Sequence, residues 1–323
     1  MRIKPVYGVH PSRCFGPSLG IDPLMPPKKC IYDCIYCPLG GSGKRYVEPM
    51  SLVRPAEIEG DLREFIKVNG CVFEHVLIWG MGDPLLNYYT PLIVSSIKEV
   101  LAQQGCRAEV SVRTTGYMLE HEYARQVLVE ADRLLVVLDA GPELRGTINN
   151  PARGFTLRRL VGILKKIPAK YKSKIWIEAN LLRIGSESNA QLPVIEELLS
   201  MLSLTGIRNF IVKPVNRPGK EPGIKPVRGK LLSRAIEKLV ENDYNVMECS
   251  RSVETISLSE TSPESIYNHV LRKPLSTREI SIVYGTGGIR EAERMVEAGY
   301  LEKITWMNEI FFKARRTIDT FTS

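Results

Sequence analysis

Apolar and polar residues form two kinds of segment that alternate along this chain. Short runs of β-branched and other apolar residues are followed by longer stretches in which apolar positions recur at helical spacing. This alternation is typical of β/α units that build a parallel sheet. Strands are expected at Val72–Trp79, Ala108–Thr114, Arg133–Leu138, Ser173–Asn180 and Asn209–Pro214. Helices are expected at Ala56–Val68, Thr90–Gln104, Glu120–Glu130, Thr156–Lys166, Leu192–Leu204 and Lys230–Asn242.

Five or six such units in succession predict an α/β fold with a full or partial β/α barrel. In a barrel, the loops that follow the strands form the active site. A doubly wound open sheet is the alternative, because the order of the strands cannot be read from the sequence.

The last part of the chain has a different pattern, which predicts a small winged-helix-like domain at residues 257–323. A linker rich in Ser, Glu and Thr lies near Ser257–Pro263. Three helices followed by a hairpin describe such a domain, and winged helices often bind nucleic acid. Acidic residues on the third helix oppose phosphate binding, so a protein-contact or structural role is at least as well supported. The helices are expected at Glu264–Leu271, Thr277–Val283 and Ile289–Ala298, and the hairpin strands at Tyr300–Thr305 and Glu309–Lys313.

The composition describes an ordinary globular protein of 323 residues, 44% of them apolar. The chain contains no apolar run near the roughly 20 residues that span a bilayer, so no membrane partner is expected. The N-terminal residues lack the apolar core of a secretory signal. Together with free cysteines, this predicts a cytoplasmic protein.

The formal net charge of +8 is concentrated in the main domain. Residues 151–177 carry eight Lys or Arg and no acid, and residues 205–230 carry seven against one Glu. Residues 260–323 are neutral, with nine basic and nine acidic side chains. A phosphate-rich partner such as RNA would explain the excess, and a solvated face without a partner would explain it equally well.

Three cysteines, Cys30, Cys34 and Cys37, lie within eight residues of each other in a loop-like segment. Three thiolates on one short loop can hold three irons of a cubane cluster and leave the fourth iron open for chemistry.

Other roles for the cysteines are less well supported. A zinc site needs four ligands, and a distant His10 or Cys14 would have to complete it. A disulfide scaffold is unnecessary in a chain long enough to build its own core. Cys71, Cys106 and Cys249 lie singly and are expected to be buried small hydrophobic residues, as Cys14 is if it is not a cluster ligand.

The spacing Cys-x3-Cys-x2-Cys, with Tyr36 before the last cysteine, resembles the signature of the radical S-adenosylmethionine (radical SAM) superfamily. Companion segments occur in the expected order. The run Ile78–Leu85 resembles the glycine-rich segment at the end of the second strand of the family, and it has Asp83 where most members have Glu. The turn Thr114–Gly116 resembles a Thr-Asn-Gly turn, and the segment ending in Asp139 and Ala140 resembles Ser-Leu-Asp-Ala, with Val137 in place of Ser.

The resemblance implies that the three cysteines hold a 4Fe–4S cluster whose open iron binds S-adenosylmethionine. One electron from the cluster then cleaves the cofactor to a 5′-deoxyadenosyl radical, which abstracts hydrogen from the substrate. The protein positions the cofactor and excludes water and oxygen. An electron donor of the flavodoxin or ferredoxin type is implied as a partner. The implied cofactor contacts are Tyr36, Gly80, Met81, Gly82, Asp83, Pro84, Thr114, Thr115 and Asp139.

Three other segments are similar to one branch of the superfamily, which is grouped with the wyosine-type tRNA-modifying enzymes. They are residues 7–21, Ile148–Pro151 and Lys213–Pro218. The resemblance implies a partial (β/α)6 barrel over residues 1–256, with an N-terminal extension at residues 1–25.

These observations predict a radical SAM enzyme that acts on tRNA or on another phosphate-bearing molecule. The first alternative is a radical SAM enzyme that acts on a protein or a small metabolite. The second, of a different class, is a regulator that binds an iron–sulfur cluster or zinc and contacts DNA through the winged helix. The sequence assigns no catalytic residue and leaves the oligomeric state open.

Overall fold

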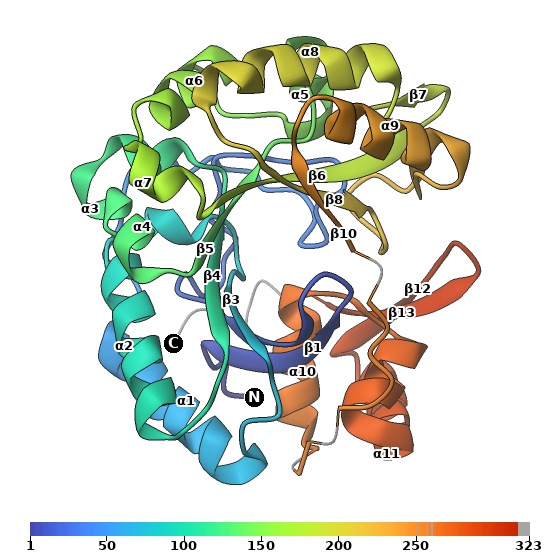
Figure 1. Ribbon diagram of the computed structural model, residues 1–323. Helices are drawn as coiled ribbons and strands as arrows, with labels where there is room; N and C mark the ends of the chain where they lie inside the picture. The colour runs from blue at the N-terminus through green and yellow to red at the C-terminus, as the bar shows by residue number, and fades with distance from the viewer. Residues whose placement is uncertain (250, 257, 260, 316–323) are drawn as a thin grey trace.

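The computed structural model describes residues 1–249, 251–256, 258–259 and 261–315. Its main element is a strongly curled sheet with helices on its outer side, closed over part of its circumference only (Figure 1). The neighbours in this sheet follow the order β1-β2-β3-β4-β5-β6-β8-β10. The bounds are β1 Val6–Ser12, β2 Gly16–Ile21, β3 His75–Ile78, β4 Glu109–Thr114, β5 Arg133–Val137, β6 Ile175–Ile184, β8 Asn209–Pro214 and β10 Asn245–Glu248.

The strand order decides between the two predicted architectures. β1 and β2 pair antiparallel, and every later neighbour on this path pairs parallel. Along this path the strands are neighbours in the order in which they occur in the chain. In a doubly wound sheet, the order of the strands reverses once, at the switch point. The predicted partial barrel is therefore confirmed, and the doubly wound alternative is wrong.

Most of the helices on the outer face of the sheet present one apolar side to it, whereas the short α7 has no buried residue. In α6 the residues Leu160 and Leu164 are fully buried, while Arg158 and Lys165 on the opposite side are exposed. This is the pattern of an amphipathic helix packed on a core. The covering helices are α1 Pro55–Asn69, α2 Thr90–Gln103, α5 Pro142–Asn149, α6 Leu157–Lys165, α7 Ala169–Lys172, α8 Leu192–Leu202 and α9 Lys230–Glu241.

The expected helix at Glu120–Glu130 is wrong as a single element. The chain forms the short helices η2 Tyr117–Glu120, α3 Glu122–Arg125 and α4 Val127–Glu130, and His121 between the first two is extended. The remaining short elements were not predicted. They are η1 Pro84–Leu86, η3 Ser203–Thr205, β7 Glu187–Ser188 and β9 Ile224–Pro226.

The structure corrects the interpretation of four cysteines. Cys14 forms a disulfide with Cys249, and Cys71 forms one with Cys106. Cys14 is therefore neither a plain thiol nor a cluster ligand, and Cys71 is exposed rather than buried. The partners are 235 and 35 residues apart, so only the fold brings them together. Cytoplasmic localisation, which was inferred partly from free cysteines, stays a prediction.

Residues 1–25, expected as an extension, contain β1 and β2 of the main sheet. In the C-terminal part, two helices were expected at Thr277–Val283 and Ile289–Ala298, and α11 (Thr277–Glu297) consists of two helices that meet at Gly285, whose φ of 65° and ψ of −169° are not helical. The order of the elements is that of a winged helix, although this assignment and the domain boundary stay predictions, and residue 257 lies outside the described residues. The elements are α10 Pro263–Arg272, β11 Leu275–Ser276, α11 Thr277–Glu297, β12 Leu301–Trp306 and β13 Glu309–Ala314.

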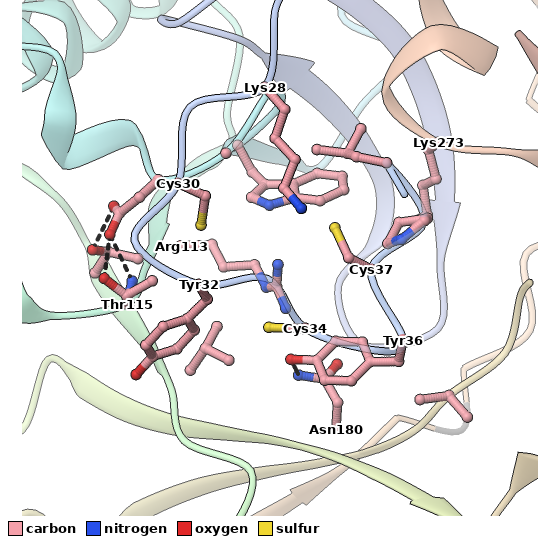
Figure 2. Close-up of a pocket in the computed structure, with 18 of the residues that line it drawn as sticks. Lys28, Cys30, Tyr32, Cys34, Tyr36, Cys37, Arg113, Thr115, Asn180 and Lys273 are labelled. Carbon is pink, nitrogen blue, oxygen red and sulfur yellow. Dashed lines mark hydrogen bonds between the residues drawn. The ribbon is translucent and has the colours of Figure 1, made fainter. Parts of the chain in front are cut away.

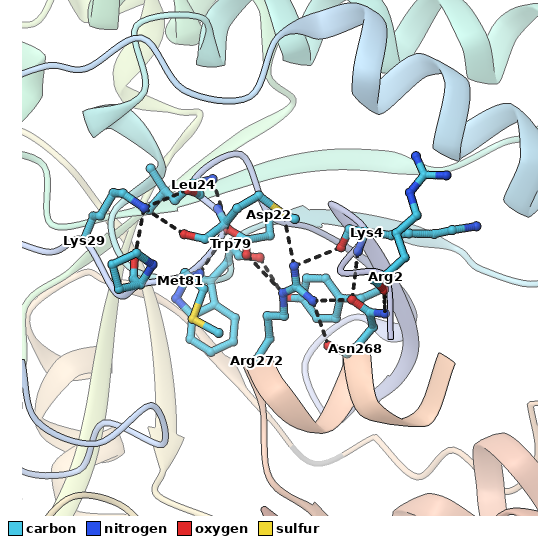
Figure 3. Close-up of polar contacts among 12 residues, drawn as sticks. Arg2, Lys4, Asp22, Leu24, Lys29, Trp79, Met81, Asn268 and Arg272 are labelled. Carbon is cyan, nitrogen blue, oxygen red and sulfur yellow. Dashed lines mark hydrogen bonds and ion pairs between the residues drawn. The ribbon is translucent and has the colours of Figure 1, made fainter. Parts of the chain in front are cut away.

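The C-terminal elements lie across the open side of the curled sheet, where α10 and α11 contact β1 (Figure 1). A fully buried ion pair fastens them there (Figure 3). Arg272 ends α10, and Asp22 directly follows β2. Arg272 Nε donates to Asp22 Oδ2 at 3.0 Å. The other oxygen of Asp22 accepts from the backbone N–H of Met81 at 3.1 Å. One carboxylate therefore joins the first strands, the turn after β3 and the C-terminal part.

In the part of the chain that the structure describes, we find no helix with the length and apolar character needed to cross a bilayer.

We predict that Arg272→Met lowers the free energy of unfolding by about 3–5 kcal/mol, because it leaves the Asp22 carboxylate buried without its cation. Glu64→Gln, which removes the exposed ion pair with Lys4, serves as the control and should cost less than about 1 kcal/mol. Urea unfolding followed by circular dichroism measures both. Equal losses in the two variants would contradict the importance given to the buried pair.

Candidate active site

A pocket opens at the ends of the parallel strands, beneath the loop of residues 28–40, which we call the cysteine loop. Cys30, Cys34 and Cys37 line this pocket, and their sulfur atoms surround a common space (Figure 2). The strand ends provide the other walls, as expected for a barrel. Side chains from β3, β4, β5, β6 and β8 reach the pocket, among them Leu77, Arg113, Val137, Asn180 and Lys213.

Backbone hydrogen bonds hold the cysteine loop against the turn that follows β3. Lys29 N–H donates to Met81 O at 2.7 Å, and Asp83 N–H donates to Lys29 O at 2.9 Å. Within the loop, Cys37 N–H donates to Cys34 O at 3.0 Å. The cysteine side chains are thus oriented by a loop that is paired to the barrel.

The close contact between loop and turn explains the glycine at position 82. Gly82 has a φ of 130°, and a Cβ there would lie 1.7 Å from Lys29 O. Only glycine fits such a position. A Cβ at Gly80 would likewise lie 2.3 Å from Cγ of Asp22. Gly82 is thus required by the packing of the cysteine loop and Gly80 by the packing of Asp22, and Gly82 also lines the pocket.

Asp83 connects the turn after β3 to the turn after β4. Its carboxylate is 1% exposed and accepts hydrogen bonds from Thr114 Oγ1 at 2.7 Å and from Thr115 N at 3.0 Å, as well as from the Thr115 hydroxyl. Burial raises the pKa of Asp83 above its ordinary value. All three residues line the pocket. The structure therefore brings together the two segments that the sequence analysis named separately.

Asp139 lies behind the pocket rather than in it. Tyr36 Oη donates to Asp139 Oδ2 at 2.6 Å, and Asn180 N–H donates to Oδ1 at 2.7 Å. Asn149 donates to the same carboxylate and lies 3.5 Å from Cys34 Sγ. Asp139 is fully buried and orients residues that do line the pocket. Among the expected cofactor contacts, Gly80, Met81, Pro84 and Asp139 are not lining residues, whereas Tyr36, Gly82, Asp83, Thr114 and Thr115 are.

One side of the pocket is strongly basic. Arg113 forms an ion pair with Glu178 at 2.9 Å and stacks over Trp79, with Cζ 5.4 Å from the ring centre. Although burial opposes ionisation, Arg113 and then Lys213 lower the pKa of Glu178 to about 2. Lys213 also lines this side, as does Lys273 from the C-terminal part.

The family comparison agrees with this geometry. A model of the Radical SAM superfamily matches residues 24–211, more than half of the chain. The matched region contains the cysteine loop and the strand ends from β3 to β6. The chain belongs to the radical SAM superfamily.

Relatives are similar over most of the chain at low identity. A protein named GTPase Obg from Brachyspira hyodysenteriae is 25% identical over 311 residues, which are 93% of this chain and 43% of that protein. The UPF0026 protein MJ1312 of Methanocaldococcus jannaschii is 23% identical over 320 residues, which are 95% of this chain and 94% of that protein. The chain thus spans less than half the length of the first relative and nearly all of the second.

Solved structures also resemble the chain at low identity. Native anSMEcpe with bound AdoMet has a TM-score of 0.47 and 16% identity, and the match covers 71% of this chain and 64% of that one. A mutant of spore photoproduct lyase has a TM-score of 0.43 and 11% identity, and the match covers 69% of this chain and 74% of that one. The predicted radical SAM enzyme is confirmed at the level of superfamily and fold, by the family match and the barrel.

The pocket residues fit the cluster that the radical SAM superfamily implies. Burial raises the pKa of Cys34 to about 12 and raises that of Cys30 still further. Such thiols stay protonated at neutral pH unless a bound cation stabilises the thiolate, as iron does. Among the described residues, no three His, Cys, Asp or Glu side chains are arranged to hold a single metal ion. A cubane cluster instead binds each thiolate through a different iron.

The distant ligands considered for a zinc site do not reach the cysteines. Cys14 is bonded to Cys249. His10 does not line the pocket, and its Nε2 lies 3.8 Å from Glu279.

Two residues at the site carried no usable signal in the sequence. Asn149 lies within the segment Ile148–Pro151 that resembles the family branch, but nothing in that segment pointed to Cys34. Lys273 lies in the C-terminal part, far along the chain from the barrel. Only the three-dimensional structure places these side chains at the site.

We predict that Glu178→Gln destabilises the fold by about 3–5 kcal/mol at neutral pH, because Arg113, whose side chain is 14% exposed, is left without its partner. Since the folded pKa of Glu178 is lowered from 4.5 to about 2, its contribution is complete above pH 4.5 and is lost as the pH falls toward 2. The stability difference between wild type and variant should therefore narrow over that range.

Thermal unfolding at several pH values measures this difference. Glu99→Gln, on the exposed side of α2, is the control and should follow the wild type throughout. A difference for Glu178→Gln that stays constant between pH 4.5 and 2 would contradict the ion pair.

Proposed function

We propose that this chain is a radical SAM enzyme in which Cys30, Cys34 and Cys37 hold three irons of a 4Fe–4S cluster. The observation that carries the proposal is the convergence of the three sulfur atoms on one pocket at the ends of the barrel strands. When bound, the cluster and S-adenosylmethionine supply one-electron cleavage of the cofactor and hydrogen abstraction from a substrate. A donor of the flavodoxin or ferredoxin type would deliver the electron.

The chain supports a cluster at the thiols in two ways. Asn149 Nδ2 lies 3.5 Å from Cys34 Sγ and provides a hydrogen bond to sulfur. Lys28 Nζ donates to Gly40 O at 2.9 Å, which fastens one end of the cysteine loop to the other. Although burial disfavours its charge, the cysteine sulfurs, Cys37 first, hold the pKa of Lys28 above its ordinary value when they are ionised as cluster ligands. A lysine that stays cationic offsets part of the negative charge of the thiolates.

The walls of the pocket provide a cradle for S-adenosylmethionine. Gly82 exposes backbone to the pocket, and the Asp83 carboxylate fixes the turn that carries Thr114 and Thr115. Tyr36 is held in place by its hydrogen bond to Asp139. Apolar side chains such as Leu77 and Val137 form the remaining wall and exclude water from the reacting groups.

RNA is the proposed substrate, with tRNA as the leading case because of the resemblance to the wyosine-type branch. The basic stretch at residues 151–177 supports this, since Arg153, Arg158, Lys165 and Lys166 are exposed around α6. In the stretch at residues 205–230, Arg217 is 7% exposed and faces the interior, whereas Arg208, Lys220, Lys225, Arg228 and Lys230 are exposed. This stretch also contains Glu221, and the stretch around α6 contains no acidic residue. The surface around α6 is therefore the better candidate for phosphate contacts.

We predict that Cys30→Ala, Cys34→Ala and Cys37→Ala each abolish the formation of 5′-deoxyadenosine by anaerobically reconstituted and reduced protein. Each variant should also bind markedly less iron and sulfide than the wild type, because one cluster ligand is missing. The double variant Cys71→Ala/Cys106→Ala should keep the wild-type iron content. Full activity in any of the three single variants would refute the ligand set, and 5′-deoxyadenosine from the wild type would eliminate the regulator alternative.

We predict that the protein binds tRNA at low salt and that Lys165→Gln/Lys166→Gln makes the dependence of log K on log salt less steep by about 1.4–1.8. The reason is that two fewer phosphates are neutralised. The control Lys67→Gln/Arg107→Gln removes two exposed charges elsewhere and should keep the wild-type slope. Filter binding at several salt concentrations measures both. Cleavage of S-adenosylmethionine without any binding of tRNA at low salt would reject RNA as the substrate.

A further inference from the structure

The basic side of the pocket is built from two parts of the chain that are distant in sequence. Lys213 lies at the end of β8, and Lys273 directly follows α10. Both line the same pocket as the three cysteines, and Lys273 lies across the cavity from Thr115 (Figure 2). The C-terminal part therefore contributes a charged side chain to the site as well as covering the open side of the barrel.

The carboxylates on this side are already paired with guanidinium groups. Glu178 accepts from Arg113 Nε at 2.9 and 3.1 Å through its two oxygens. Glu279 accepts from Arg217 Nη2 at 2.9 Å. Each carboxylate is thus largely neutralised by an arginine before either lysine is considered.

The two lysines are left with little compensation. Lys213 Nζ lies 3.5 Å from Glu178, at the limit of a hydrogen bond, and its side chain is 31% exposed. For Lys273 Nζ, the described residues provide no hydrogen bond or ion pair, although the backbone N–H of Lys273 donates to His269 O at 3.0 Å. Arg113, Lys213, Arg217 and Lys273 therefore line this side of the pocket, whereas the two carboxylates are not among its lining residues.

Crowding of like charges is unfavourable in a partly buried site. Burial, followed by the charge of Arg217, lowers the pKa of Lys273 well below its ordinary value. Burial also lowers the pKa of Lys213, against the opposing effect of Glu178. An anion between the two ammonium groups would relieve this repulsion and restore their charge.

Lys273 is held in position rather than being a mobile surface lysine. The preceding residue, Arg272, forms the fully buried ion pair with Asp22. Arg217 Nη1 also donates to Pro274 O, on the other side of Lys273. Both neighbours of Lys273 are thus fastened to the barrel, which directs its side chain into the pocket.

We propose that Lys213 and Lys273 form a binding site for an anionic oxygen group of the substrate, a carboxylate or a phosphate. This inference rests on the proposed function, since it takes the cavity beside the cysteines to be the place where the substrate reacts. Pockets formed between two parts of a chain are common binding sites, and a few converging polar groups orient the ligand in them. The group bound by the lysines would fix which substrate atom faces the cluster.

The experiment uses anaerobically reconstituted full-length protein and two probes, inorganic phosphate and malonate. Isothermal titration calorimetry with wild type is expected to show binding of at least one probe, and the preferred probe identifies the group. Lys273→Met and Lys213→Met should each weaken that binding at least tenfold. The control Lys67→Met, on the exposed side of α1, should bind as the wild type does. Lys273→Arg should retain binding, which separates loss of charge from loss of fold.

The titration is repeated with saturating S-adenosylmethionine, because the carboxylate of the cofactor is the other source of such an anion. Retained binding supports a substrate site, whereas loss of binding would assign the lysines to the cofactor and overturn the inference. Absence of binding in the wild type, or unchanged binding in both methionine variants, would also overturn it.

Formation of 5′-deoxyadenosine by the wild type is measured separately. Its absence would reject the proposed function alone, and failed probe binding despite cofactor cleavage would reject the anion site alone.

Discussion

The fully buried ion pair between Asp22 and Arg272 is the contact on which the arrangement of the site depends. Asp22 directly follows β2, and its second oxygen accepts the backbone N–H groups of Leu24, Met25 and Met81. Arg272 also donates to Asn268. The carboxylate therefore fixes the segment that leads into the cysteine loop and the turn after β3 at the same time. A buried pair of this kind is costly to break, because the remaining charge has no solvent to stabilise it.

The pocket exists because the barrel is incomplete. A closed barrel fills its interior with side chains, whereas this sheet stops at β1 on one side and β10 on the other. The disulfide between Cys14 and Cys249 links the turn after β1 to the end of β10. The C-terminal elements cover the remaining opening, and Lys273 projects from them into the cavity. The cysteine loop, the strand ends and the C-terminal part thus enclose a single site.

Much of the barrel and of the cysteine loop could be predicted from the sequence, because periodicity and local spacing are sequence properties. β8 was predicted with its observed bounds. β2 was missed together with its antiparallel partner β1, since Gly16 and Pro17 contribute no strand signal. The parallel partner of β2 is β3, which comes more than 50 residues later. Asp139 was predicted at a strand end as a cofactor contact, but it lies behind the pocket. Whether a residue at a strand end reaches the cavity depends on the tertiary structure. The same holds for Lys273 and for both disulfides, which depend on contacts between distant segments.

The central claim is that the three cysteines leave one iron of the cluster free to bind S-adenosylmethionine. Electron paramagnetic resonance of the reduced, reconstituted protein tests this directly, since the spectrum reports on the ligands of the cluster. We predict that adding S-adenosylmethionine shifts the signal of the reduced cluster. A spectrum that is identical with and without saturating cofactor would contradict the claim.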